Sequence, residues 1–187
     1  NDIINKKYDC DFTDLFIIDV RFPYEYEGGH IRGAVNYPNP KQFIDDFFEE
    51  HIEDALIVVH CELSHDRGPK SCSMFRNYDR DMNSYPDLSY PLLFLLKGGY
   101  KDFYSKFPER CEGGYVRMKA RDHRGSLASS NSTFRDGLRE ANNSRRRDGQ
   151  LSSCLSSPSL SILASPVRNS DAVLCSPVVQ SRYNRHK

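Results

Sequence analysis

The sequence predicts an α/β fold, a three-layer sandwich with a mainly parallel central sheet. Three short apolar runs, over residues 15–20, 55–60 and 91–96, have the pattern of strands buried on both faces. The runs lie about 30 to 40 residues apart, which leaves room for the crossover helix that each parallel connection requires. We therefore expect helices on both faces of the sheet.

Three segments between and after these runs predict the helices. Residues 40–48 place apolar side chains three to four positions apart, as an amphipathic helix on a sheet does. Residues 70–81 follow Pro69, which suits the first turn of a helix. A third candidate helix covers residues 100–107, directly after a pair of glycines. Together they predict layered helices around the sheet.

The chain changes character from about Gly125. Ser, Asn and Arg dominate there, aromatic residues become rare and no periodic apolar face persists. Such a segment cannot offset its ordering entropy by burial. We predict a domain over residues 1–120 and a disordered Ser/Arg-rich tail over residues 121–187, with three Ser-Pro pairs as candidate phosphorylation sites.

Charge and cysteine content exclude several classes. The net charge is +0, but acidic residues dominate through Gly114 and basic residues from Tyr115 onward, which does not suit a folded nucleic-acid reader.

The six cysteines form no C-x-x-C pair, so we expect a reducing, intracellular compartment. We expect no membrane span or signal peptide. The initial Asn is compatible with a fragment.

The segment from His60 to Pro69, HCELSHDRGP, carries the candidate chemistry. It connects a predicted strand to a predicted helix, and such a loop can direct backbone N–H groups and a helix N-terminus at a phosphate. The same field favours the thiolate of Cys61, a candidate nucleophile. Arg67 can bind two phosphoryl oxygens through its planar fork. A Cys-x5-Arg spacing alone is weak evidence, and its place between strand and helix is what favours catalysis.

Three motifs in order resemble the M-phase inducer phosphatases, the cell-division-cycle 25 family. They are VRFPYEYEGGHI from Val20, HCELSHDRGPK from His60, and YPDL from Tyr85 with LLKGGYKDFY from Leu95. The similarity extends from about Phe16 to Tyr104 and weakens toward Arg117. It implies a rhodanese-like catalytic domain that removes phosphate from phosphothreonine and phosphotyrosine of cyclin-dependent kinases, through a phosphocysteine, and so promotes cell-cycle progression.

The resemblance carries the family's site onto particular residues. Cys61 takes the place of the nucleophile and Arg67 that of the phosphate-binding arginine. The amides of six loop residues take the place of the phosphate loop: Glu62, Leu63, Ser64, His65, Asp66 and Arg67. Glu62 and Asp66 are both candidate proton donors, and Asp66 departs from the family's Glu. No metal or organic cofactor is implied.

The partners and surroundings follow from the same resemblance. A cyclin-dependent kinase with its cyclin is the expected protein substrate, with no nucleic acid or membrane partner, and the chain is expected to be a monomer of the cytoplasm and nucleus. Family members continue into a basic C-terminal docking segment, and the similarity of this chain to that segment weakens after Arg117. Which kinase is the substrate stays open.

A second departure from the family concerns redox protection. Many members carry a second cysteine where this chain has Val20, able to form a disulfide with the nucleophile. Cys72 is the candidate replacement, although packing is the favoured interpretation of this residue. We interpret the polar residues Asp19, Arg21, Glu25 and His30 as one structural network rather than as catalysts.

Two other functions remain as alternatives. A rhodanese-type sulfurtransferase would use the loop cysteine as a persulfide, but its loop is typically one residue shorter. A non-catalytic rhodanese-like binding module would keep the surface without the chemistry, and the presence of both Cys61 and Arg67 disfavours it.

Overall fold

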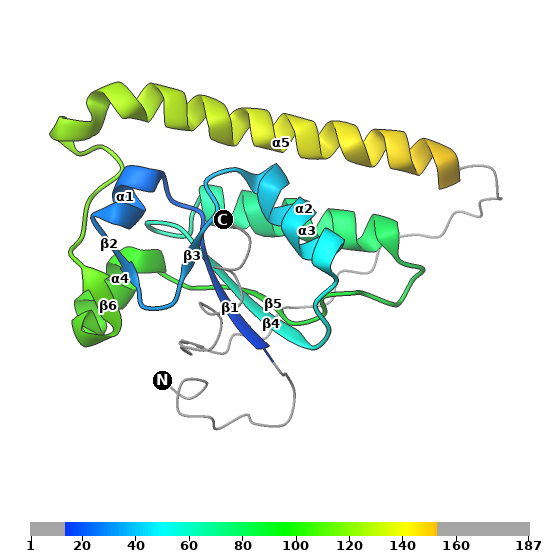
Figure 1. Cartoon of the computed structure of the whole chain (residues 1–187), viewed down its shortest axis with the longest axis horizontal. Coiled ribbons are helices and arrows are strands. Elements are labelled where there is room, and N and C mark those ends of the chain that lie inside the picture. Colours follow the sequence, from blue (N-terminus) through cyan, green and yellow to red (C-terminus); the bar gives the residue numbers. More distant parts are fainter. Residues whose placement is uncertain (1–13, 153–187) are drawn as a thin grey trace.

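The computed structural model describes residues 14–152. Four parallel strands form its central sheet (Figure 1). They are β1 (Asp14–Asp19), β3 (Val35–Asn36), β4 (Ala55–His60) and β5 (Leu93–Leu95), in the order β3-β1-β4-β5. β1 and β4 pair along their whole length, with Asp19 opposite His60 at the last position. The chain therefore leaves both central strands at the same edge of the sheet.

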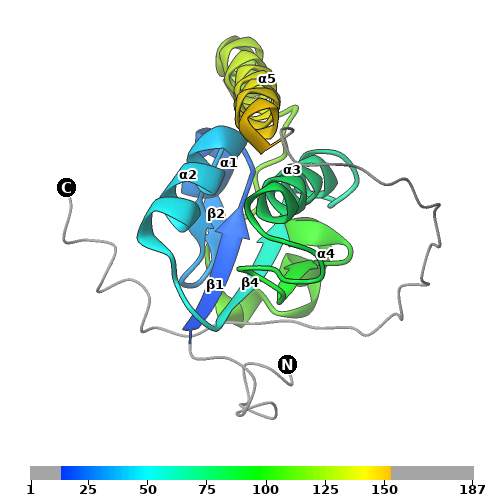
Figure 2. The same cartoon turned by 90° about the vertical axis from the view of Figure 1, so that its right-hand side faces the viewer.

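Helices cover the two faces of this sheet. On one face lie α2 (Pro40–Glu50) and α3 (Arg67–Met82), and on the other lies α4 (Gly99–Lys106) (Figure 2). An antiparallel pair, β2 (Gly29–Ile31) with β6 (Cys111–Gly113), packs beside α4. The remaining elements are the short helix α1 (Pro23–Glu27), the 3-10 turns η1 (Pro108–Arg110) and η2 (Arg121–His123), and α5 (Arg124–Ser152).

The alternation of side chains along β1 explains its continuous apolar sequence. Phe16 and Ile18 pack with α2 and α3, whereas Leu15 and Ile17 pack with α4. Successive side chains of a strand point to opposite faces, so a strand covered on both faces must be apolar at every position. The three-layer α/β fold predicted from these runs is confirmed.

The elements differ from their predicted bounds by a few residues, as element ends commonly do. α3 begins three residues earlier than predicted, at Arg67, and α2 extends two residues further, to Glu50. β5 is shorter than the predicted run, and the prediction that it is buried was wrong. It is the edge strand of the sheet, where Phe94 is 44% and Leu95 38% exposed.

The predicted disorder of the tail is wrong for residues 124–152. They form the helix α5, which runs across α2 and α3 on their outer side (Figure 1). Phe134 and Ala141 are buried there, with Leu138 packed between them. A few apolar residues at helical spacing are enough to dock this polar segment, because α2 and α3 already provide an apolar surface. The rest of the predicted tail, residues 153–187, lies outside the described residues.

Over residues 14–152, the structure contains no helix that is both long and apolar enough to span a membrane.

Candidate active site

Cys61 directly follows the last residue of β4, at the carboxyl edge of the sheet. Its side chain is 3% exposed. The first turn of α3 approaches the thiol closely, because a Cβ atom on Gly68 would lie 3.6 Å from Cys61 Sγ. The strand, loop and helix predicted around Cys61 are therefore present, with the N-terminus of α3 beside the sulfur.

The loop from Glu62 to Asp66 has unpaired backbone N–H groups. Within residues 14–152, none of these five amides donates a hydrogen bond to a protein acceptor. Ser64 adopts a left-handed conformation, with φ of 53°. Its hydroxyl is buried and has no hydrogen-bond partner in the described chain. A buried hydroxyl without a partner is costly, and an anion in the loop would accept hydrogen bonds from it and from the unpaired amides.

The N-terminus of α4 orients the start of this loop. Tyr100 N–H donates to the carbonyl of Cys61 at 2.9 Å, and Lys101 N–H donates to the carbonyl of Glu62 at 3.0 Å. In a trans peptide, the carbonyl and the following N–H point in opposite directions. The amides of Glu62 and Leu63 are therefore directed away from α4.

Arg67 is the first residue of α3, and its guanidinium is nearly buried. It forms a two-pronged ion pair with Glu25: Nη1 lies 2.5 Å from Oε2 and Nη2 lies 3.0 Å from Oε1. Its Cζ also lies 4.4 Å from the centre of the Phe22 ring. Burial disfavours the charged form, but the hydrogen bonds and charge of Glu25 outweigh this effect and raise the pKa of Arg67 above its ordinary value.

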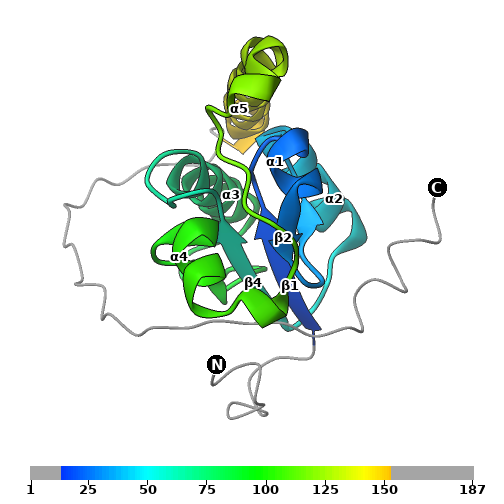
Figure 3. The same ribbon diagram turned by 90° about the vertical axis from the view of Figure 1, so that its left-hand side faces the viewer.

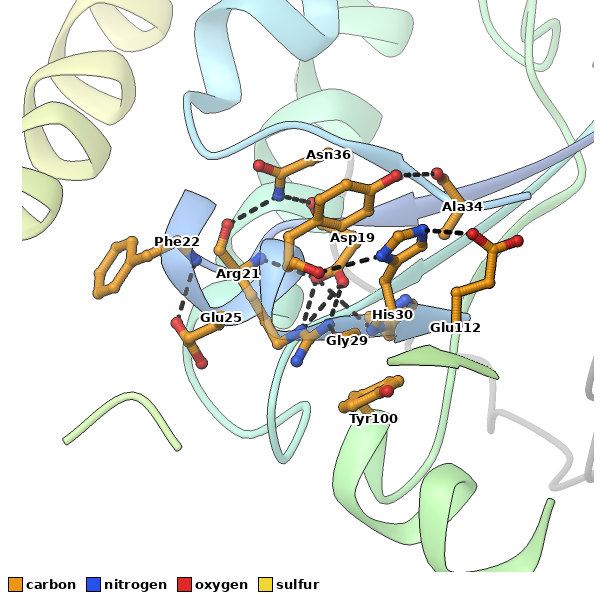
Figure 4. A network of polar contacts seen from close by, with 12 residues as sticks. Asp19, Arg21, Phe22, Glu25, Gly29, His30, Ala34, Asn36, Tyr100 and Glu112 are labelled. Atoms are coloured by element: carbon orange, nitrogen blue, oxygen red, sulfur yellow. Dashed lines mark hydrogen bonds and ion pairs between the residues drawn. The ribbon is translucent and has the colours of Figure 1, made fainter. Parts of the chain in front are cut away.

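A second buried ion pair lies at the end of β1. Asp19 accepts hydrogen bonds from the guanidinium of Arg21, the shortest at 2.6 Å, and Arg21 also donates to the Gly29 carbonyl (Figure 4). The Tyr100 ring covers the guanidinium, with Cζ 3.9 Å from the ring centre. This pair connects the end of β1 to β2 and α4, next to the loop.

The predicted single network of four polar residues is divided in the structure. Asp19 and Arg21 pair with each other, as expected. Glu25 instead binds Arg67, which lies 42 residues away in the sequence. His30 Nδ1 lies 3.0 Å from the Tyr26 carbonyl oxygen, and its ring stacks on Tyr26. Three sites thus replace the one predicted.

The side chain of Glu62 points toward the segment that leads to α5. We call residues 114–120 the strap; it passes α1 on its way to α5 (Figure 3). Tyr115 donates its hydroxyl proton to Glu62 Oε1 at 2.6 Å, and Met118 N–H lies 3.4 Å from Oε2. Tyr24 donates to the Met118 carbonyl at 2.5 Å. Burial and the charge of Glu62 raise the pKa of Tyr115, so this phenol remains a donor at neutral pH.

Asp66 is placed differently from Glu62. Its side chain is 68% exposed and forms an ion pair with Lys70, one turn further along α3. Of its loop neighbours, Leu63 is 41% exposed, and His65 is also exposed. The two candidate proton donors thus occupy different environments: one is attached to the strap and the other faces solvent.

Cys72 lies in α3 and packs against the core on the same face as Cys61. Burial raises the pKa of its thiol to about 12. The described cysteines, Cys61, Cys72 and Cys111, are free thiols. A thiol with so high a pKa is a poor partner for disulfide exchange, which favours packing over redox protection. Val20 is fully buried.

Over residues 14–152, no group of three or more His, Cys, Asp or Glu side chains has the arrangement of a metal site.

The comparisons with known proteins agree with this fold. Residues 2–106 match the family described as "Rhodanese-like domain", and the chain belongs to this family. Its curated relatives include M-phase inducer phosphatase 1-B of Xenopus laevis, 41% identical over 75% of this chain and 27% of that protein. They also include human M-phase inducer phosphatase 3, 38% identical over 74% of this chain and 31% of that protein. The resemblance to M-phase inducer phosphatases is confirmed.

The chain spans about a quarter to a third of these two relatives. A solved yeast protein tyrosine phosphatase of the rhodanese family is also similar. It is 24% identical, with 55% of this chain and 78% of that chain covered and a TM-score of 0.43. A likeness of this size carries no argument about function.

Proposed function

We propose that this protein is a cysteine-dependent, dual-specificity protein phosphatase. One observation carries the proposal: the thiol of Cys61 lies under a loop whose amides have no protein acceptor among the described residues, beside the N-terminus of α3 and the cation of Arg67. This arrangement suits a phosphate dianion with a nucleophile beneath it. Relatives named M-phase inducer phosphatase support the same function.

In the proposed reaction, the thiolate of Cys61 attacks phosphorus and the bond from phosphorus to the substrate oxygen breaks. The phosphoryl group passes to sulfur as a phosphocysteine, and the leaving oxygen takes up a proton. Water then attacks phosphorus, releasing inorganic phosphate and the thiolate. The amides of residues 62–67 and the Arg67 cation bind the phosphoryl oxygens in both steps. No resident cofactor or metal is part of the proposal.

The contacts of Glu62 and Asp66 favour different roles for them. Glu62 accepts hydrogen bonds from the Tyr115 hydroxyl and the Met118 amide, so both of its carboxyl oxygens are occupied by the strap. We therefore propose that Glu62 holds the strap against the loop. Asp66 is 68% exposed, and its only described partner is the exposed Lys70, so it does not hold the strap, and we propose it as the candidate proton donor.

The substrate class proposed here is the one that the resemblance in sequence implies. We propose phosphothreonine and phosphotyrosine of a cyclin-dependent kinase, presented with its cyclin, and a role in cell-cycle progression in the cytoplasm and nucleus. The buried thiol needs no second subunit to complete its loop, so we propose that a monomer acts. Arg117 and Lys119 in the strap provide positive charge beside the loop.

The test measures phosphate release from an aryl phosphate and from a doubly phosphorylated kinase peptide, with thiosulfate sulfurtransfer measured in parallel. We expect Cys61→Ser to lose phosphate release by at least about 1000-fold, because the hydroxyl is a poor nucleophile without a base. Arg67→Lys should lose about 100-fold, because an ammonium cannot bind two oxygens in one plane. Circular dichroism and thermal unfolding check the folding of both variants.

Wild-type protein that releases no phosphate from either substrate would overturn the proposal. Sulfurtransfer that depends on Cys61 would then identify a sulfurtransferase. A protein that does neither but binds the kinase would be a rhodanese-like binding module.

A further inference from the structure

We propose that Glu25 is a positioning residue, which determines the edge of the Arg67 guanidinium that binds phosphate. The proposal rests on the phosphatase function proposed above and extends it to a residue outside the Cys-x5-Arg motif. Glu25 lies in α1, and neither the spacing nor the sequence around Cys61 indicates a contact between the two elements.

Glu25 occupies the end of the guanidinium. Its two oxygens accept from the two terminal nitrogens, Nη1 and Nη2, in the end-on arrangement. A guanidinium carries five N–H bonds in one plane, so three remain. Two of these, on Nε and Nη2, lie parallel along one side. Among the described residues no acceptor binds Nε of Arg67, so this side is available for two phosphoryl oxygens.

The carboxylate itself is held firmly. Glu25 is fully buried, and Phe22 N–H donates to its Oε2 at 3.0 Å (Figure 4). The Phe22 ring lies over one face of the planar Arg67 guanidinium. The fork is therefore fixed by a charge at one end and by an aromatic ring on one face. Fixing a donor before the substrate arrives removes the reorganisation that would otherwise slow the chemical step.

The negative charge of Glu25, taken by itself, should weaken the binding of a phosphate dianion to Arg67. A carboxylate partly neutralises the cation that has to attract a phosphate dianion. If charge alone mattered, removing that of Glu25 would strengthen phosphate binding. If position matters, removing it weakens binding, because the fork can then turn away. The two interpretations therefore predict opposite changes in phosphate affinity when the charge of Glu25 is removed.

The test uses Glu25→Gln, which keeps the size but replaces one acceptor oxygen with a donor that faces an Arg67 N–H. We expect kcat for an aryl phosphate to fall between about 10- and 100-fold. The affinity for tungstate, measured by calorimetry on Cys61→Ser protein, should fall by a similar factor. Glu27→Gln is the matched control: Glu27 is exposed on the same helix, so activity and tungstate affinity should stay unchanged.

A double-mutant cycle with Arg67→Lys separates positioning from stability. Lysine has no fork to position, so Glu25→Gln should cause little further loss of kcat or tungstate affinity in the Arg67→Lys background. Equal losses in both backgrounds, or a loss that follows the melting temperature alone, would show a purely structural role and overturn the proposal. If Glu25→Gln does not fold, Glu25→Asp replaces it in the cycle, because its shorter side chain cannot reach both nitrogens.

The tungstate measurement distinguishes the two proposals. Wild type that binds tungstate but releases no phosphate would overturn the phosphatase function while the cycle still decides the role of Glu25. Tungstate affinity that rises in Glu25→Gln, or a wild type that binds no tungstate, would overturn the positioning role.

Discussion

Gly99 lies against the backbone of the loop that begins at Cys61, where a side chain has no room. It adopts φ of 65°, a conformation that costs any other residue free energy. A Cβ atom there would lie 2.5 Å from the Cys61 carbonyl oxygen and 2.6 Å from that of Glu62. These carbonyls accept the hydrogen bonds from α4 that orient the loop. One glycine therefore allows α4 to approach Cys61.

We predict that Gly99→Ala lowers the free energy of unfolding by about 1 to 3 kcal/mol. It should also reduce phosphate release, since the Cys61 and Glu62 peptides must move. Urea unfolding and an aryl phosphate assay measure the two effects. Gly114→Ala is the control, because its Cβ would meet its nearest neighbour at an ordinary 3.7 Å. Equal effects at both positions would contradict the close approach of α4.

At the scale of elements, α5 shows how little apolar surface a docked helix requires. Its sequence is rich in Ser, Asn and Arg, yet it packs on α2 and α3. Gly137 faces the start of α2, where a Cβ would lie 2.1 Å from Asn39 Oδ1 and 2.9 Å from Pro40 Cδ. Gly125, on the same helix, has no atom within 4 Å of its Cβ position. Gly125 is therefore a control for Gly137 on the same helix.

We predict that Gly125→Ala and Gly137→Ala change the stability of the protein in opposite directions. Alanine is favoured over glycine within a helix, so Gly125→Ala should stabilise the protein by up to about 1 kcal/mol. Gly137→Ala should destabilise it, because the clash with Asn39 and Pro40 outweighs that gain. Thermal unfolding of the two variants measures the difference. Stabilisation by both substitutions would show that α5 does not dock on α2 in solution.

At the scale of the whole molecule, the layers enclose ionisable groups in the centre of the fold. His60 is fully buried at the end of β4, with Nδ1 3.8 Å from Asp19 Oδ1. Neither ring nitrogen has a hydrogen-bond partner in the described chain. Burial lowers the pKa of His60 from 6.5 to about 4, since the attraction of Asp19 is weaker than the cost of burying a charge. The folded protein therefore holds His60 neutral.

This pKa shift predicts that the free energy of unfolding decreases as the pH is lowered. Between about pH 6.5 and pH 4 the unfolded chain binds a proton at His60 that the folded chain does not, so stability rises with pH over this range. The total loss from neutral pH to about pH 4 should reach about 3 kcal/mol. The carboxylate of Asp19 adds little within this range. Its pKa lies below 3.8 because Arg21 and His60 outweigh its burial, so its contribution is lost only at lower pH.

Urea unfolding at a series of pH values tests this prediction. The curve for His60→Asn should be flatter between about pH 6.5 and pH 4 than the wild-type curve, whatever its absolute stability, because Asn does not titrate. Curves of equal slope would place the acid sensitivity elsewhere in the protein.

Local pattern determined the fold class and the centre of the site. Buried strands and their crossover helices follow from runs and spacings within a few residues, and the Cys61 loop lies in one short segment between two of them. The tertiary structure decided which distant residues meet. Glu25 binds Arg67 across 42 residues, and Tyr115 reaches Glu62 across 53. α5 docks because an apolar surface formed elsewhere is available to it. These contacts depend on packing between elements, and the spacing of residues within one segment carries no information about it.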